Sequence, residues 1–148
     1  MICWIEKKYK KEYLNSSKVS GIKSYFENGL DELIISKIKD FISFVRKRYY
    51  IPIRINIYFS NRNYYIYKED KHKFYAVFFG GNDEEYPSIY IASKGNVIDD
   101  IIFSLAHEIT HYYQWYFLDD KKRTNRSLEI EANRWAYYIY NLYLEYKI

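Results

Sequence analysis

Residues 104–120, SLAHEITHYYQWYFLDD, contain the pattern that decides both the expected fold and the expected site. His107 and His111 are four residues apart, so on a helix they project from the same face, one turn from each other. Two imidazoles placed in this way can converge on one metal ion. Glu108 follows the first histidine, where a carboxylate can take a proton from water held by that ion. The segment matches the pattern HExxH, which is typical of zinc-dependent peptidases.

The residues around the two histidines predict a buried helix from about residue 97 to residue 117. Its expected apolar side consists of Ile101, Ile102, Leu105, Ala106, Ile109 and Tyr112. A helix with such a side packs against a core. The alternative, a surface helix that happens to carry two histidines, does not require Glu108 beside them.

A third metal ligand has to come from elsewhere, because a catalytic zinc usually takes three protein ligands and a water. No histidine follows His111, and His72 lies in the charged turn KEDKHKF, where we expect it to face solvent. The downstream segment SLEIEANRWA offers Glu129 and Glu131, of which only one can face the site. The expected buried stripe of their helix consists of Leu128, Ala132, Trp135, Ala136, Ile139 and Leu142. At 100° per residue, Glu131 lies nearer to this stripe. We therefore predict Glu131 as the ligand and Glu129 as a solvated side chain.

The rest of the chain predicts an α+β domain. A helical pattern begins at Leu30 and ends before Pro52, and alternating apolar residues at 53–59 predict a half-buried strand. Further strands are expected at 64–68, 73–81 and 88–93, and a last helix runs from about residue 127 to near the end. Strands grouped before two helices favour a small antiparallel or mixed sheet of three to four strands with helices on one face. We expect strand 88–93, the last before the histidine helix, to be an exposed edge that pairs with an extended substrate.

Composition places the chain among ordinary globular domains. It has 148 residues, 49% of them apolar, and a net charge of +4, so we expect one domain over 1–148, with 1–20 as a loosely held N-terminal arm. The lone cysteine, Cys3, excludes an internal disulfide framework. With no apolar stretch of signal-peptide or membrane-spanning length, the sequence predicts a cytoplasmic protein without membrane contact.

The sequence resembles the ImmA/IrrE family of small zinc metallopeptidases over about its last 50 residues. HEITH at 107–111 and EIEANRWA at 129–136 match the family's HExxH and its downstream Glu-Ala-Asn segment. The resemblance implies a zincin-like fold of the gluzincin type, with zinc held by His107, His111 and Glu131 and with Glu108 as general base. Thr110 stands where the family often has glycine, and the usual Leu-Leu-Met-Pro tail is absent. The resemblance also implies cleavage of a regulatory protein such as a repressor, in a phage or mobile element.

Two other functions remain open on sequence alone. One is a metal-bound module that binds a partner protein without cutting it, for which Glu108 would be unnecessary. The other is a DNA-associated peptidase of the SprT-like kind, with basic residues 7–11 or 46–48 as its contact. That family takes its third ligand from a downstream histidine, which this chain lacks, so nucleic acid is not the expected partner.

Overall fold

The computed structural model describes residues 21–117 and 123–147. The expected N-terminal arm at 1–20 lies outside the described residues. Within them, the elements follow in the order β1 (Ile22–Phe26), α1 (Glu32–Arg48), β2 (Ile55–Ser60), β3 (Tyr65–Ile66), β4 (Lys73–Phe74), β5 (Ala76–Phe79), β6 (Ser88–Ala92), α2 (Ile98–Phe117) and α3 (Asn125–Tyr146). The predicted α+β class is confirmed, and the two C-terminal helices begin within two residues of their expected positions.

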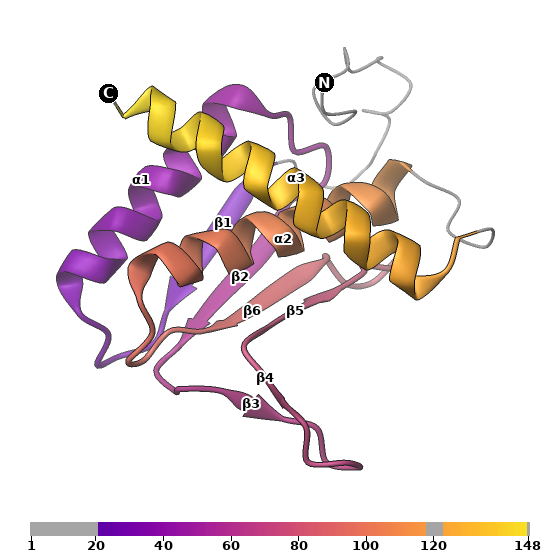
Figure 1. The fold of residues 1–148 in the computed structure, drawn as a ribbon, viewed down its shortest axis with the longest axis horizontal. Helices are drawn as coiled ribbons and strands as arrows, with labels where there is room; N and C mark the ends of the chain where they lie inside the picture. The colour runs from indigo at the N-terminus through magenta and orange to yellow at the C-terminus, as the bar shows by residue number, and fades with distance from the viewer. Residues whose placement is uncertain (1–20, 118–122, 148) are drawn as a thin grey trace.

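The main sheet is mixed and has the strand order β1-β2-β6-β5 (Figure 1). β1, β2 and β6 are parallel, and only β5 runs antiparallel to its neighbour. α1 connects β1 to β2, as a crossover between parallel neighbours requires. The sequence interpretation lacked β1, because residues 22–26 are a short segment with few aliphatic residues.

The prediction that strand 88–93 is an exposed edge is wrong. β6 lies inside the sheet, where it pairs with β2 on one side and with β5 on the other. Its buried residues Ile89, Ile91 and Ala92 fit this central position. Among the described residues, β5 is the edge strand on that side of the sheet.

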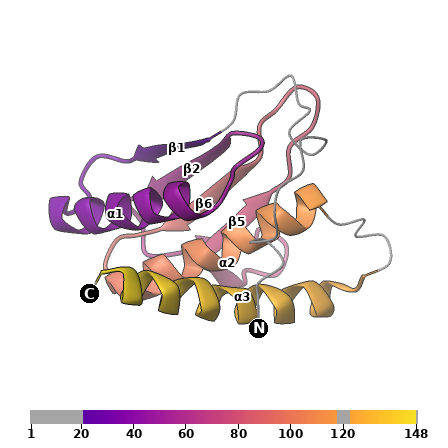
Figure 2. The same ribbon diagram turned by 90° about the horizontal axis from the view of Figure 1, so that it is seen from above.

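The helices cover one face of the sheet (Figure 2). α1 begins with Asp31 as N-cap, whose carboxylate accepts a hydrogen bond of 2.7 Å from the backbone N–H of Leu33. It buries Ile38, Phe41, Ile42, Phe44 and Val45. The opposite face of the sheet carries a row of stacked rings from Tyr25, Tyr58 and Tyr90, with 4.8 Å between neighbouring centroids.

α2 is the central helix, because it contacts α1, α3, β5 and β6. All six residues of its expected apolar side are buried. The phenol of Tyr112 donates a hydrogen bond of 2.6 Å to the carbonyl of Ile53, and that of Tyr113 donates one of 2.8 Å to the carbonyl of Tyr50. These bonds satisfy two buried hydroxyls and fix α2 to the segment between α1 and β2.

α3 packs along α2. Ala132 and Ala136 are fully buried, and small residues at these positions let the helices approach closely. Thr124 caps the helix by accepting a hydrogen bond of 3.0 Å from the backbone N–H of Ser127. None of the helices in the described ranges has the length and apolar character needed to cross a membrane.

β3 and β4 form a small hairpin that projects from the main sheet (Figure 1). The expected strand 73–81 is therefore two strands, which belong to different sheets on either side of Tyr75. Tyr67 packs on Phe74 within the hairpin, with ring centroids 4.5 Å apart. The hairpin brings Tyr67 to the edge of the hollow described below.

Candidate metal centre

α2 places the two histidines of the HExxH pattern side by side. Their Nε2 atoms are 3.2 Å apart, and both side chains are partly buried, with 16% exposed. The spacing of four residues on one helix accounts for this arrangement. The predicted convergence of His107 and His111 is therefore present in the structure.

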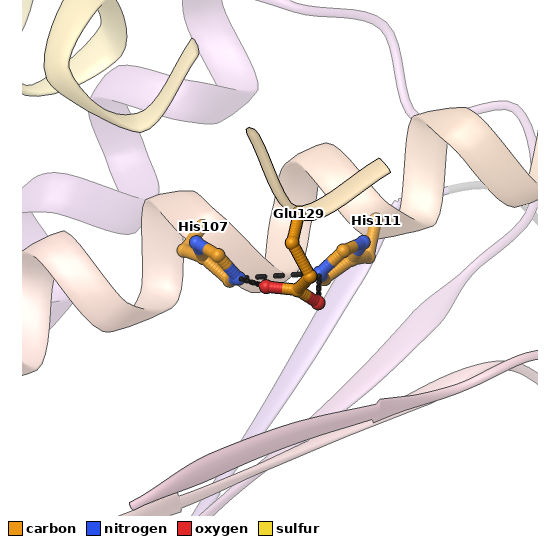
Figure 3. A group of neighbouring side chains, drawn as sticks. All are labelled: His107, His111 and Glu129. Carbon is orange, nitrogen blue, oxygen red and sulfur yellow. Dashed lines mark hydrogen bonds and ion pairs between the residues drawn. The ribbon is translucent and has the colours of Figure 1, made fainter. Parts of the chain in front are cut away.

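Glu129 of α3 is the carboxylate that meets them (Figure 3). Its Oε2 atom lies 3.0 Å from His107 Nε2, and its Oε1 atom lies 2.8 Å from His111 Nε2. The three side chains form a group whose ligand atoms all lie within 4.8 Å of one another, an arrangement that can hold a metal ion.

The group also fits zinc in chemistry and in spacing. Imidazole nitrogen and carboxylate oxygen are ordinary zinc ligands, and bonds of 2.0–2.1 Å in a tetrahedron separate two ligand atoms by about 3.3 Å. The three distances of 3.2, 3.0 and 2.8 Å are within about half an ångström of that value.

Gln114 determines which nitrogen of His111 faces Glu129. The side-chain amide of Gln114 donates hydrogen bonds to the carbonyl of Leu128 and to a carboxylate oxygen of Glu131, at 3.0 and 2.9 Å. Its own oxygen therefore faces His111 Nδ1, at 2.7 Å, and accepts a hydrogen bond from it. When the His111 ring is neutral, its Nε2 atom therefore has a lone pair and no proton. This lone pair faces the Glu129 carboxylate, which also has no proton to donate. A cation or a proton between them removes that repulsion.

Glu131 does not lie with the histidines, and this corrects the position expected of it. Its Oε1 atom accepts hydrogen bonds of 2.9 Å from Arg123 and from Gln114. Arg123 also donates to the backbone carbonyl and hydroxyl of Ser127, which holds the guanidinium at the start of α3. Glu131 thus supports the site through Gln114 rather than facing it.

The position of the buried stripe on α3 explains why Glu129, and not Glu131, faces the histidines. Its buried residues are Ala132, Trp135, Ala136, Ile139 and Tyr143, whereas Leu128 and Leu142 are only partly buried. At 100° per residue the centre of this stripe lies about 40° from Leu128, toward Glu129. Glu129 is then about 60° from the centre and Glu131 about 100°. The stripe expected from the sequence included both leucines and omitted Tyr143. Its centre therefore lay closer to Glu131 than to Glu129.

Glu108 is buried, with 7% of its surface exposed. Burial, followed by the negative charge of Glu129, raises the pKa of its carboxyl to about 8. Burial and then the neighbouring His111 lower the pKa of His107. A proton is thus favoured on Glu108 and disfavoured on His107. A cation at the site would offset the second cause of the Glu108 shift.

A hollow of about 440 Å³, here called the histidine cleft, opens onto these groups. Glu108, His111 and Glu129 line it from the helices, Ala76 and Phe78 from β5, and Tyr67 from the hairpin. Gly80 lies at its end, where a Cβ atom would come within 2.7 Å of the Trp115 ring. The cleft therefore runs between α2 and the edge strand of the sheet.

The other sequence expectations for the site can now be placed. His72 is exposed on the hairpin, as predicted. Gln114, Arg123 and Asn133, which hydrogen-bonds the His107 ring, were not predicted as site residues. Gln114 lies three residues after His111 and therefore on the same helix face, which was the available signal.

Comparisons of the chain with protein-family models, with curated proteins and with solved structures gave no match.

Proposed function

We propose that the protein is a zinc-dependent peptidase with a zincin-like fold, in which His107, His111 and Glu129 hold the ion. The observation that carries the proposal is the meeting of two imidazoles and a carboxylate at zinc-ligand spacing, beside a buried carboxyl in an open cleft. Zinc bound there would supply a Lewis acid that polarises a water molecule and the carbonyl of a peptide bond.

Glu108 would act as the general base. It would take a proton from the attacking water and later pass it to the leaving amine. Zinc would offset the charge of Glu129 that contributes to the raised pKa of Glu108, which favours the ionised carboxylate that a general base requires. A module that only binds a partner has no use for this group.

Tyr67 is our candidate for the donor that stabilises the developing oxyanion. The chain has 20 tyrosines, and the sequence gives no means of choosing among them. In the part of the chain that the structure describes, Tyr67 is the tyrosine that lines the histidine cleft together with Glu108 and His111. A phenol hydroxyl is a suitable donor for this role.

β5 would bind the substrate as an added strand. The backbone N–H of Ala92 donates to the carbonyl of Tyr75, so Tyr75 and Ala92 form a hydrogen-bonded pair next to the β5–β6 ladder. Alternation along an antiparallel pair turns the backbone groups of Ala76 and Phe78 outward. An extended peptide paired with them would lie along the histidine cleft.

The resemblance to the ImmA/IrrE family extends the proposal to a substrate class. It favours a cytoplasmic peptidase that cuts a regulatory protein such as a repressor. HEITH and the Glu-Ala-Asn segment support this reading, with the ligand role at Glu129 in place of Glu131.

Cleavage of an unfolded protein by the purified chain tests the function. We expect cleavage with zinc, loss of cleavage with a chelator, and recovery when zinc is restored. Glu108→Gln should keep zinc and lose cleavage, because the base is not a ligand. Zinc-bound wild-type protein that cuts no unfolded protein would favour a non-catalytic metal-binding module instead.

A further inference from the structure

A second hollow, of about 380 Å³, lies beside the N-terminal half of α2. Asp100, Phe103 and Ser104 line it from the helix, and Tyr75 and Ile91 line it from the sheet. We call it the Asp100 hollow. Tyr75 directly precedes Ala76, which lines the histidine cleft, so the two hollows are lined by successive residues at the start of the edge strand β5.

The Asp100 hollow and the metal ligands share one face of α2. Asp100 is seven residues before His107, which is two helical turns or about 10 Å along the axis. An extended peptide rises about 3.4 Å per residue, so about three of its residues span that distance. A substrate lying along β5 with its scissile bond at the histidines would place a side chain two or three residues away over this hollow.

The walls of the hollow suit a long side chain with a positive end. Phe103 supplies apolar surface for a methylene stem, and the Tyr75 ring is half exposed at the rim. Asp100 is the charged group of the lining, and the described residues give it no ion pair or hydrogen bond. Its neighbour Asp99, in contrast, is hydrogen-bonded to the hydroxyl of Tyr140.

We propose that the Asp100 hollow receives a lysine or arginine side chain of the substrate, two or three residues from the scissile bond. The inference rests on the proposed peptidase function, because it uses the same cleft. Asp100 would pair with the cationic end, while Phe103 would pack on the stem. The proposal makes Asp100 a specificity-determining residue and leaves the chemistry at Glu108 unchanged.

The competing explanation for Asp100 is its position in the first turn of α2, where acidic side chains stabilise a helix. Asp99 has the same advantage but does not line the hollow. Asp99→Asn is therefore a matched control. Both variants lose one charge from the first turn, and only Asp100→Asn changes the hollow.

The first experiment maps cleavage sites in a mixture of unfolded proteins by mass spectrometry. Wild type and Asp99→Asn should share an enrichment of about tenfold for Lys and Arg, two or three residues from the cut and on one side of it. Asp100→Asn should lose the enrichment, and Asp100→Lys should replace it with a preference for Asp and Glu. Cleavage without this enrichment, or with the same enrichment in Asp100→Asn, would contradict the proposed subsite. Neither result would contradict the proposed peptidase function.

A binding experiment separates failure of the subsite from failure of the peptidase. The full chain carrying Glu108→Gln is titrated with acetyl-Gly-Gly-Arg-Gly-Gly-amide and with the same peptide carrying Glu, and backbone amide shifts are followed by NMR. The arginine peptide should shift Asp100 and Ser104, with binding at least about fivefold tighter than the glutamate peptide, even if the wild type cuts nothing. Equal binding of the two peptides, or shifts elsewhere only, overturns the proposal.

Discussion

Glu129 and Glu131 differ in one respect that decides their roles, which is the side of α3 on which each lies. Glu129 faces the two histidines, whereas Glu131 is held by Arg123 and Gln114. A proposed ligand and a residue that supports the site through another side chain should respond differently to mutation. Loss of a zinc ligand removes a direct bond to the metal. Loss of a contact that only supports a ligand typically lowers metal affinity by about 10- to 100-fold.

We predict that Glu129→Ala lowers zinc affinity by at least about a hundredfold, while Glu131→Gln lowers it by about tenfold or less. Competition with a zinc chelator of known affinity measures both. Glu131→Gln keeps a side-chain oxygen that can accept from Arg123 and Gln114, which makes it a conservative comparison. A larger loss for Glu131→Gln than for Glu129→Ala would return the ligand role to Glu131.

Glu108 gives a prediction for pH and stability in the metal-free protein. Its folded-state pKa of about 8 lies above its ordinary value of 4.5, so the folded state binds the proton more tightly than the unfolded state. This contribution to stability is complete below about pH 4.5 and is lost as the pH rises through about 8. The difference corresponds to roughly 3 to 5 kcal/mol.

Denaturant unfolding with a chelator present, between pH 5 and pH 8.5, measures this loss. Glu108→Gln should remove most of the decline with pH, because a neutral amide does not titrate. Parallel pH curves for the wild type and the variant would show that Glu108 is ionised normally in the folded protein.

At the scale of elements, helix periodicity was the informative signal and strand pairing was not. Ile101, Leu105 and Ile109 repeat at helical spacing, and α2 was predicted to within about one residue. The order β1-β2-β6-β5 depends on which strands meet in space, and a single sequence does not contain that information. The position of Glu131 relative to the histidines was mispredicted for a related reason. The choice of Glu131 depended on a small angular margin, which changes with the burial of Leu128 and Tyr143 on the helix.

The edge strand β5 gives a prediction about substrate binding. Ala76→Pro removes a backbone N–H that faces away from β6, so it should lower cleavage of an extended peptide by at least about tenfold. The sheet keeps its own hydrogen bonds, and zinc content should stay unchanged. Cleavage rate and zinc content measured on the same preparation test this. A folded, zinc-containing Ala76→Pro that cuts at the wild-type rate would place the substrate elsewhere.

At the scale of the whole molecule, the proposed ion would join two helices that come from different parts of the chain. His107 and His111 lie on α2, and Glu129 lies on α3. Zinc at 100 times its dissociation constant would stabilise the folded state by about 2.7 kcal/mol, provided that it binds the folded state alone. For a domain of this size we predict a rise of about 5–10 °C in Tm.

Calorimetry with zinc and with a chelator measures that rise. His111→Ala serves as the control and should show little difference between the two conditions. Equal Tm values for the wild type in both conditions would mean that zinc does not bind selectively to the folded protein.

The central claim is that zinc is bound by His107, His111 and Glu129, and anomalous diffraction at the zinc edge from crystals of the full chain tests it most directly. We predict one anomalous peak per chain, about 2.0–2.2 Å from an Nε2 atom of each histidine and from a carboxylate oxygen of Glu129. Glu131 should remain with Arg123 and Gln114. Crystals grown with zinc that show no peak between α2 and α3, or a peak bonded to Glu131 in place of Glu129, would contradict the account.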